Sequence, residues 1–473
     1  MHDRFYVTTA IPYVNGAPHI GHALELVQAD VLARHARARG RPTRFLTGTD
    51  DNALKNVQAA RTAGVDVTAF VTANAARFAA LRSPLALSND DFVRTGTDPR
   101  HRPTVEWLWR ACAAAGDLYR RRYEGWYCGG CEQFYDAGDG CTEHAGSLER
   151  VAEENWFFRL SRYERDIVDA IRRGTLRIEP AHRRNEVLAF AAAGLRDFSV
   201  SRPRERAHGW GIPVPGDDAQ VIYVWFDALA NYVSALRAPG GDDYRRWWCD
   251  APDRVHVIGK GILRFHAVYW PAILRSADQP WPTTIFVHDY LTVDGAKIGK
   301  SLRNAVDPSA LASEYGTDAL RWWLLREVPR AGDADFTVER LVGAANRDLA
   351  NGIGNFVRRV AGLASRAVDA AVPPSAAAPL ARAIAAAPAT VDAALADFDF
   401  RRALDAVLAV VTEGNRYIDA SRPWERAADV RPLVAAVDTL GTELAPFVPD
   451  VAARVRARAA EPVFARLELA EVS

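Results

Sequence analysis

Near the start of the chain stands Pro18-His19-Ile20-Gly21-His22, the turn between a predicted strand and a predicted helix. The strand is expected within residues 5–14, where β-branched and aromatic residues alternate, and the helix over 19–39, which has helical periodicity and few breakers. A second strand is predicted over 43–49. Strand, turn, helix and strand in this order open a nucleotide-binding βαβ fold with a parallel sheet.

The middle of the chain reads as an insertion into that sheet. Residues 54–116 look helical, and 117–150 then change to tyrosine, glycine, cysteine and short polar pieces, which is typical of a small inserted module. Helical periodicity returns over 161–196. The apolar runs 221–224 and 255–258 are predicted to be buried strands that complete the sheet begun at residue 5.

Length and charge restrict the class of protein. A chain of 473 residues predicts two to four domains, and the alanine- and arginine-rich part after residue 338 predicts a bundle of four or five helices. The 59 basic and 59 acidic residues cancel, which argues against a strongly basic nucleic-acid binder. No apolar run reaches membrane-spanning length and Met1–Phe5 lacks the apolar core of a signal peptide, so we expect a cytoplasmic protein with no membrane partner.

Lysine is scarce and its positions are informative. Only Lys55, Lys260, Lys297 and Lys300 are lysines among the 59 basic residues. Codon bias with random survivors is the simpler explanation. However, all four lysines fall where a nucleotide-binding fold places its ligands, after strands or in glycine-flanked turns, so we favour retention where a compact ammonium is needed.

The turn at the first helix and a later loop are both suited to phosphate. A helix N-terminus attracts anions, His19 and His22 can donate to phosphate oxygens, and Gly21 would let a base approach the backbone. Alone, this turn is more simply an ordinary cap. The loop Lys297-Ile298-Gly299-Lys300-Ser301 adds two ammonium groups that could stabilise a departing pyrophosphate.

Together the two motifs resemble the HIGH and KMSKS signatures of class I aminoacyl-tRNA synthetases, and more closely those of the methionyl-tRNA synthetase family. The resemblance covers essentially the whole chain. It is carried further by the segments Ala10–Gly16, Leu46–Asp50, Tyr223–Ala228, Phe265–Pro271 and Asn415–Asp419.

The resemblance implies a division of the chain and a set of ATP-site residues. The fold would be an α/β Rossmann-type catalytic domain in two halves, 1–116 and 221–285, split by a connective insertion at 117–220 and followed by a KMSKS-loop and stem-contact region at 286–337 and an all-α anticodon-binding domain at 338–473. The substrate would be ATP with Mg²⁺. The catalytic residues would be His19, His22, Lys297 and Lys300, and further ATP contacts would come from Gly21, Gly259, Lys260 and Ser301.

The amino-acid pocket is implied by the same resemblance. Aromatic residues near strand ends are more often core than ligand. In methionyl-tRNA synthetases, however, the matching positions line the methionine pocket, and a thioether packs well against ring edges. The implied residues are Ile11, Tyr13, Trp225, Ala228, Leu229, Tyr232 and His266, with Asp50 as the partner of the substrate's ammonium group.

Four soft side chains in the insertion have the spacing of a zinc knuckle. Cys128-x2-Cys131 and Cys141-x2-His144 form two chelating pairs suited to tetrahedral Zn²⁺. The alternative is reduced cysteines in a loop. In the related synthetases such a knuckle is structural and positions the acceptor end of tRNA.

In the C-terminal part, Asn355 and Arg359 share a helix face and Trp424 follows a proline. Taken alone these are a solvated pair and a packed tryptophan. The resemblance implies instead that they read the CAU anticodon, with tRNA(Met) and methionine as partners of a monomeric enzyme. Stacking on an aromatic ring is a usual way to hold a splayed RNA base.

Four departures from the family pattern lie around the ATP site. Where the family has Thr-Asp-Glu-His-Gly, this chain has Asp51, Asn52 and Ala53 after Asp50. Gly261 replaces the family's aspartate after Gly-Lys, Asp289 replaces a glycine, and Ile298 and Gly299 replace the methionine and serine of KMSKS. Three hypotheses therefore stay open: a divergent methionyl-tRNA synthetase, a tRNA-independent paralogue that adenylates an amino acid and passes it to a small molecule in natural-product biosynthesis of the hydrazine-forming type, and a catalytically poor RNA-binding regulator.

Overall fold

The computed structural model of the chain falls into two compact units. The structure describes residues 3–128, 133–135, 148–298, 304–364, 374–424, 429–458 and 462–469. The first unit comprises Met1–Pro18, Arg41–Ala80 and Asn89–Val287, and the second comprises His19–Gly40, Leu81–Ser88 and His288–Ser473.

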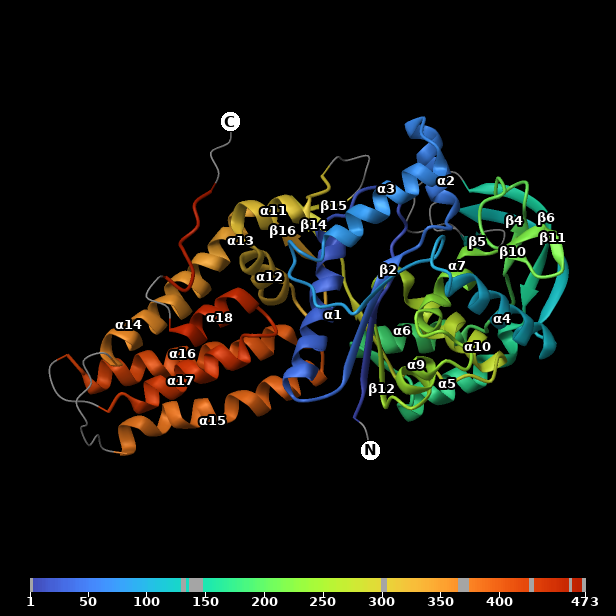
Figure 1. The fold of residues 1–473 in the computed structure, drawn as a ribbon. Helices are drawn as coiled ribbons and strands as arrows, with labels where there is room; N and C mark the ends of the chain where they lie inside the picture. The colour runs from blue at the N-terminus through green and yellow to red at the C-terminus, as the bar shows by residue number, and fades with distance from the viewer. Residues whose placement is uncertain are drawn as a thin grey trace. The chain divides into compact units, whose positions relative to one another are not determined.

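A six-stranded sheet forms the centre of the first unit (Figure 1). Its order is β3 (Asp91–Arg94), β2 (Thr43–Thr49), β1 (Phe5–Thr9), β12 (Asp253–Gly259), β13 (Thr284–His288) and β7 (Arg177–Glu179). The pairs of β1 with β2 and β12, of β2 with β3, and of β13 with β7 are parallel. Every residue of β1 is buried, as expected for a strand inside a parallel sheet that is covered on both faces.

The sheet confirms the predictions for the opening of the chain and corrects three later ones. The predicted helix over 19–39 and strand over 43–49 are present, and the run 255–258 pairs with β1. The segment 54–116 is not all helical, because β3 interrupts it, and 161–196 contains β7. The run 221–224 does not join this sheet, because its first two residues end β11 (Asp217–Ile222) in a separate antiparallel sheet.

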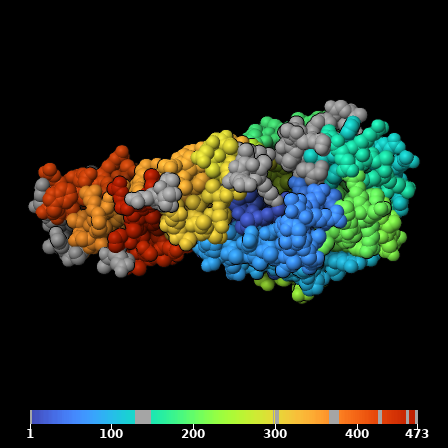
Figure 2. All heavy atoms as spheres, turned by 90° about the horizontal axis from the view of Figure 1, so that it is seen from above, coloured from blue at the N-terminus to red at the C-terminus, as the bar shows by residue number. Residues whose placement is uncertain are grey.

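Apart from β7, the described strands of the insertion belong to two antiparallel sheets. One has the order β5 (Gln133–Tyr135), β4 (Leu118–Cys128), β6 (Glu149–Phe158) and β8 (Phe198–Ser199), and the other β10 (Pro213–Val214), β11 and β9 (Ser201–Pro203). Figure 2 shows the insertion, in cyan and green, gathered in one region of the first unit. The apolar core of the unit includes Trp109, Phe158 and Phe226, which belong to one buried cluster. Within it, the rings of Trp109 and Phe226 meet edge-on.

Helices and tight turns complete the first unit. The helices are α2 (Leu54–Ala63), α3 (Val67–Ala80), α4 (His101–Ala114), α5 (Glu164–Arg173), α6 (Ala181–Ala192), α7 (Val224–Leu229), α8 (Asn231–Ser234), α9 (Asp242–Tyr244) and α10 (Trp270–Ser276). Shorter 3-10 or π segments span Leu160–Tyr163, Arg245–Cys249, Lys260–Ile262 and Phe265–Tyr269.

The second unit is mainly helical and contains the helix that comes after β1 in the sequence. Its helices are α1 (Ile20–Ala38), α11 (Pro308–Tyr315), α12 (Thr317–Arg326), α13 (Val338–Ala344), α14 (Asn355–Ala364), α15 (Pro374–Ala396), α16 (Phe400–Ser421), α17 (Arg431–Glu443) and α18 (Pro449–Ala457), with a π segment at Ala345–Gly354. A small sheet has the order β15 (Ala296–Lys297), β14 (Leu291–Val293) and β16 (Ala334–Phe336). In the described part of the chain, no helix is both long and apolar enough to cross a membrane.

A buried arginine lies at the centre of the second unit. Arg321 of α12 is fully buried, and its guanidinium pairs with Asp30 of α1 at 2.8 Å. It also donates to the carbonyl groups of Leu85, Pro446 and Phe447. Because a buried charge is tolerated only when it is paired and hydrogen-bonded, this one side chain ties three segments together.

Candidate functional site

The two histidines that come after β1 close the N-terminus of α1 together. His19 is the N-cap residue, and its Nδ1 accepts from the backbone N–H of Gly21 at 3.1 Å. In return, Nδ1 of His22 accepts from the backbone N–H of His19 at 3.1 Å. The two rings lie 3.9 Å apart between centroids and are tilted by 32°. This is a capping box in which two imidazoles replace the usual serine and glutamate.

The capping hydrogen bonds fix the tautomer of both rings. A nitrogen that accepts a hydrogen bond carries no proton, so a neutral imidazole of this pair carries its proton on Nε2. Burial lowers the pKa of His19 to about 4. Burial, together with the neighbouring His19 and His288, lowers the pKa of His22 well below its usual value. Both side chains are therefore neutral N–H donors at pH 7.

The ring of His19 leaves little room for a side chain at position 21, which is Gly21. A Cβ atom built at Gly21 would lie 3.0 Å from Cε1 and Nδ1 of the His19 ring, closer than ordinary contacts allow. The glycine therefore permits the ring of His19 to fold back over the helix N-terminus. A site for a ligand base at this residue stays a prediction.

The second of the two predicted phosphate-binding motifs begins in the small sheet of the second unit. Lys297 is the last residue of β15 and pairs with Thr292 of β14. Gly299, Lys300 and Ser301 of the predicted loop lie outside the described residues. The hairpin therefore places the start of this motif, and the roles of its lysines and serine stay predictions.

Asp289, one of the departures from the family pattern, has a structural role. Its side chain is buried, and Oδ2 accepts from the backbone N–H of Gly332 at 2.6 Å. Gly332 has a positive φ of 96°. Asp289 thus fastens the turn before β16 to the start of β14, which gives this carboxylate a function independent of ATP.

In the first unit, the predicted amino-acid pocket is a group of aromatic side chains in mutual contact. The Trp225 ring is stacked on Phe265 with centroids 3.7 Å apart and planes 5° apart. Tyr13 and His266 approach Trp225 edge-on, with centroids at 6.3 and 6.2 Å. Ala228 and Leu229 are buried, and Ile11 packs against the same core. The structure therefore brings together these residues from three separate segments.

Tyr232 and His266 form a directed hydrogen bond within this group. Nδ1 of His266 lies 2.9 Å from the carbonyl oxygen of Ile262, which can only accept, so Nδ1 carries the proton. Nε2 then accepts from the hydroxyl group of Tyr232 at 2.7 Å. Burial lowers the pKa of His266 to about 4, which keeps the ring neutral. Neutral aromatic and imidazole surfaces of this kind suit an uncharged side chain such as a thioether.

Asp50 lies at the carboxyl end of β2, directly beside Tyr13. The two residues form a parallel β-bridge, and Asp50 is fully buried. Its Oδ1 accepts from the backbone N–H of Asn52 at 3.0 Å. The Lys55 ammonium lies 5.3 Å from the centroid of the Tyr13 ring, within cation–π range. The first unit therefore presents a buried carboxylate next to the aromatic group, as binding of an α-amino acid requires.

Two departures near Asp50 also fit their surroundings. Ala53, in place of the family's glycine, is the N-cap of α2 and packs with Tyr223 and Val224. Asn52 is half-buried and donates to Asp227.

Gly259 ends β12, and Lys260 begins the 3-10 turn after it, so both predicted ATP contacts stand at the carboxyl edge of the parallel sheet.

Of the four predicted zinc ligands, one is described. Cys128 is buried at the end of β4 and pairs with Gln133 across the β4–β5 hairpin. Cys131, Cys141 and His144 lie outside the described residues. The position of Cys128 at the end of β4 is compatible with a first knuckle ligand, and Zn²⁺ binding by the four residues stays a prediction.

The predicted anticodon residues lie on or after helices of the bundle. Asn355 and Arg359 are on α14, and the Arg359 guanidinium donates to Asn415 at 2.7 Å and to Asp419 at 3.0 Å on α16. Trp424 comes after α16 and is 59% exposed. The interpretation of Trp424 as a packed core residue is wrong, because an indole this exposed contributes little to a core and is available for stacking.

Several side chains that complete these sites were not predicted from the sequence. Phe265 covers Trp225, and His256 stacks on Tyr232 with centroids 4.0 Å apart while Nδ1 lies 2.7 Å from the Thr8 hydroxyl group. Phe265 stands next to His266, and His256 is a lone polar residue in an apolar strand, so both carried a weak signal. The pairing of His101 with Asp227 had no signal in the sequence, because it links residues 126 apart.

Comparison with known proteins identifies the family to which this architecture belongs. The profile of the family described as tRNA synthetases class I (M) matches residues 5–139 and 139–361. The methionine–tRNA ligase of Brucella suis is 40% identical over 476 residues, which cover 96% of this chain and 91% of that protein. The corresponding ligase of Thermotoga maritima is 38% identical over 435 residues, covering 89% and 68%.

A solved structure of a similar protein matches this chain over most of its length. The Mycobacterium tuberculosis methionyl-tRNA synthetase in complex with methionyl-adenylate matches with a TM-score of 0.89 and 35% identity, covering 96% of this chain and 93% of that one. The parallel sheet, with a HIGH-type histidine pair capping the helix after β1, defines a class I aminoacyl-tRNA synthetase. Within that class, the chain belongs to the methionyl-tRNA synthetase family.

Proposed function

We propose that this protein is an ATP-dependent ligase that activates methionine as methionyl-adenylate and transfers the methionyl group to tRNA(Met). The observation that carries the proposal is the aromatic group of the first unit, in which Trp225, Tyr232 and His266 contact one another or their shared neighbours beside the buried Asp50. An apolar, uncharged pocket next to a carboxylate suits an α-amino acid with a thioether side chain.

Activation is an in-line attack of the methionine carboxylate on the α-phosphate of ATP, with pyrophosphate leaving. We assign the Nε2–H groups of His19 and His22 to the ATP phosphates, and Lys297 and Lys300 to the departing pyrophosphate. Neutral N–H donors at a helix N-terminus can hydrogen-bond to the phosphate oxygens and so stabilise the phosphate charge. Gly21, Gly259, Lys260 and Ser301 are assigned to nucleotide contacts. No side-chain nucleophile is needed, because positioning and charge stabilisation supply the catalysis.

Two metal ions belong to the proposal. Mg²⁺ would accompany ATP and neutralise its phosphate charge. Zn²⁺ would be held by Cys128, Cys131, Cys141 and His144, and would supply structural closure of the insertion. The burial of Cys128 at the end of β4 supports this assignment.

The proposal that tRNA(Met) accepts the methionyl group depends on three residues of the C-terminal helical part. We propose that Asn355, Arg359 and Trp424 bind the anticodon of tRNA(Met), and the exposed indole of Trp424 supports this role. A paralogue that serves a small-molecule acceptor has no use for such a surface. The five-part division of the chain, the monomeric state and the cytoplasmic location stay predictions.

The deciding experiment is a pair of assays on the purified protein. Methionine-dependent ATP–pyrophosphate exchange tests activation, and charging of total tRNA with a panel of labelled amino acids tests the acceptor. Exchange with methionine and charging of tRNA(Met) would support the proposal. Exchange without any charging would move the assignment to the tRNA-independent paralogue, and absence of both would favour an RNA-binding regulator.

A further inference from the structure

A chain of hydrogen bonds connects the start of α4 to the carboxylate of Asp50. His101 is fully buried, and its Nε2 lies 2.6 Å from Oδ1 of Asp227. The other oxygen of Asp227 accepts from Nδ2 of Asn52 at 2.7 Å. The backbone N–H of Asn52 donates in turn to Oδ1 of Asp50 at 3.0 Å. One imidazole is thus connected, through two residues, to the predicted partner of the substrate's ammonium group.

The same imidazole also holds the wall of the aromatic pocket. Nδ1 of His101 lies 2.9 Å from the hydroxyl group of Ser234. Asp227 belongs to α7 and Ser234 is the last residue of α8, so His101 bridges the two short helices that carry Ala228, Leu229 and Tyr232. Short helices have little stability of their own and depend on such tertiary contacts.

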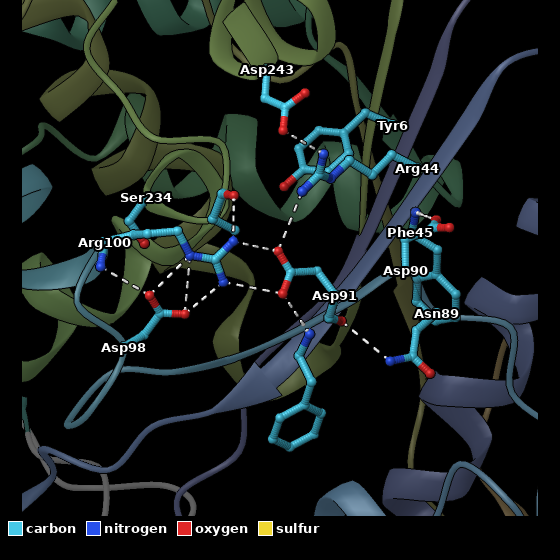
Figure 3. Close-up of polar contacts among 12 residues, drawn as sticks. Tyr6, Arg44, Phe45, Asn89, Asp90, Asp91, Asp98, Arg100, Ser234 and Asp243 are labelled. Atoms are coloured by element: carbon cyan, nitrogen blue, oxygen red, sulfur yellow. Dashed lines mark hydrogen bonds and ion pairs between the residues drawn. The ribbon is translucent and has the colours of Figure 1, made fainter. Parts of the chain in front are cut away.

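The position of His101 is itself fixed by the residue before it. Arg100 donates to both oxygens of Asp91, at 2.7 and 3.1 Å, and to both oxygens of Asp98, at 2.6 and 2.9 Å (Figure 3). It also donates to the carbonyl oxygen of Ala235, directly after α8. A guanidinium held at every edge leaves α4 one orientation at its start. The imidazole of His101 is therefore placed by a rigid anchor.

We propose that His101 is a positioning residue for the amino-acid substrate: acting through Asp227 and Asn52, it orients the Asp50 carboxylate toward the substrate's ammonium group. The inference rests on the proposed function for the role of Asp50. Its physical basis is that Asp50 and Asp227 are both buried carboxylates, and that Asn52 supplies a donor to each. The side-chain amide of Asn52 is held by Asp227 while its backbone N–H donates to Asp50, so release of Asp227 frees the Asn52 side chain and loosens the turn that orients the Asp50 carboxylate.

Two substitutions of His101 separate its two hydrogen bonds. In His101→Gln the side-chain amide can reach the position of Nε2 and still donate to Asp227. In His101→Asn the amide reaches only the position of Nδ1, so the contact to Ser234 can be kept while Asp227 is released. A matched control is Thr104→Val, since Thr104 is buried on the same helix and donates to the carbonyl group of Ala238 at 2.8 Å without touching Asp227.

The readout is the preference for an ammonium group. We would measure, by calorimetry on the full chain, the dissociation constants of methionine and of its 2-hydroxy analogue, 2-hydroxy-4-(methylthio)butanoate. In the unmodified protein methionine should bind more tightly. In His101→Asn this preference should fall about tenfold, because one charged hydrogen bond is worth roughly that factor. KM for methionine in the exchange assay should rise while kcat changes little, as for lost ground-state binding.

The outcomes are distinct. His101→Gln should retain most of the preference, and Thr104→Val should retain all of it. If His101→Asn weakens both ligands equally, His101 only supports the pocket as a packing residue, and the inference is overturned. If the unmodified protein binds neither ligand and shows no exchange with methionine, the proposed function itself fails, and the positioning role for methionine fails with it.

Discussion

The backbone N–H of His19 donates to Nδ1 of His22 at 3.1 Å, so the imidazole of His22 both caps helix α1 and is oriented by it. This double role can be divided by substitution. In His22→Asn the side-chain oxygen takes the place of Nδ1, which preserves the cap but removes the Nε2–H donor. Exchange activity should fall by roughly 10²–10³-fold with little change in thermal stability, as expected for one lost charge-stabilising donor. Activity close to that of the unmodified enzyme would refute the phosphate role.

His22→Ala is the matched variant, because it loses the cap as well. It should match the loss of exchange in His22→Asn and in addition destabilise the protein by about 0.5–1.5 kcal/mol, the usual net value of one hydrogen bond. Thermal unfolding of the two variants, measured side by side, distinguishes the capping effect from the catalytic one. Equal unfolding temperatures would mean that the His22 ring contributes nothing to the helix.

Lys300→Ala should reduce methionine-dependent exchange by about two orders of magnitude, because the ammonium group is assigned to charge that develops on pyrophosphate. Lys300→Arg keeps the positive charge and should lose less. Circular dichroism of both variants should match the unmodified protein. Exchange that is insensitive to the alanine substitution would remove this loop from the mechanism.

Purified protein should contain about one zinc ion per chain, since two chelating pairs make one tetrahedral site. Cys128→Ser should abolish metal binding and destabilise the insertion, while Cys249→Ser should do neither, because Cys249 is an exposed thiol outside the predicted ligand set. Metal analysis by mass spectrometry checks both. Folded protein that lacks zinc when purified with the metal supplied would contradict the knuckle.

Trp424→Ala should lower kcat/KM for tRNA charging by about tenfold to a hundredfold, because a stacked base is worth about 1–3 kcal/mol. Exchange in the absence of tRNA should hardly change, since anticodon binding is not part of that half-reaction. Trp424→Phe should recover part of the charging activity through its smaller ring. An equal fall in both assays would contradict a specific role of Trp424 in anticodon binding.

Asp318 should make the stability of the protein depend on pH. Burial raises the pKa of Asp318 to about 6, although the backbone N–H of Val451 donates to it at 2.6 Å. Since the folded state then holds the proton more tightly than the unfolded chain, stability is highest below about pH 4 as far as this group is concerned, and falls as pH rises toward 6. The loss is on the order of 2–3 kcal/mol.

Asp318→Asn tests this directly. The amide keeps an oxygen for the N–H of Val451 but cannot ionise, so the melting temperature of the variant should fall less between pH 4.5 and 7 than that of the unmodified protein. Asp438→Asn is a suitable control, because Asp438 pairs with Arg458 at the surface. A parallel pH dependence in Asp318→Asn and the unmodified protein would show that Asp318 is not the group responsible.

Local signals were sufficient for the parts of the fold that local physics determines. The alternation before Pro18 and the apolar periodicity of α1 each depend on residues close in sequence, and the strand and the helix that they predict are confirmed. The cap at His19, considered as the simpler alternative to phosphate binding, is present as well. The turn motif could also be recognised, although the reciprocal His19–His22 hydrogen bonds could not. Their geometry depends on both rings folding over Gly21, which composition alone does not specify.

Long-range pairing decided the rest. The three residues of β7 carry no periodic signal and become a strand only because β13, more than a hundred residues later, pairs with them. The run 221–224 looked like a central strand, yet its first two residues end β11, which pairs with β9 in the insertion. Likewise, the family resemblance implied an ammonium partner for Asp50, but only the tertiary structure connects Asp50 through Asn52 to Asp227 and His101. Hydrogen bonds between distant segments have no representation in local sequence, because either partner alone is compatible with many other structures.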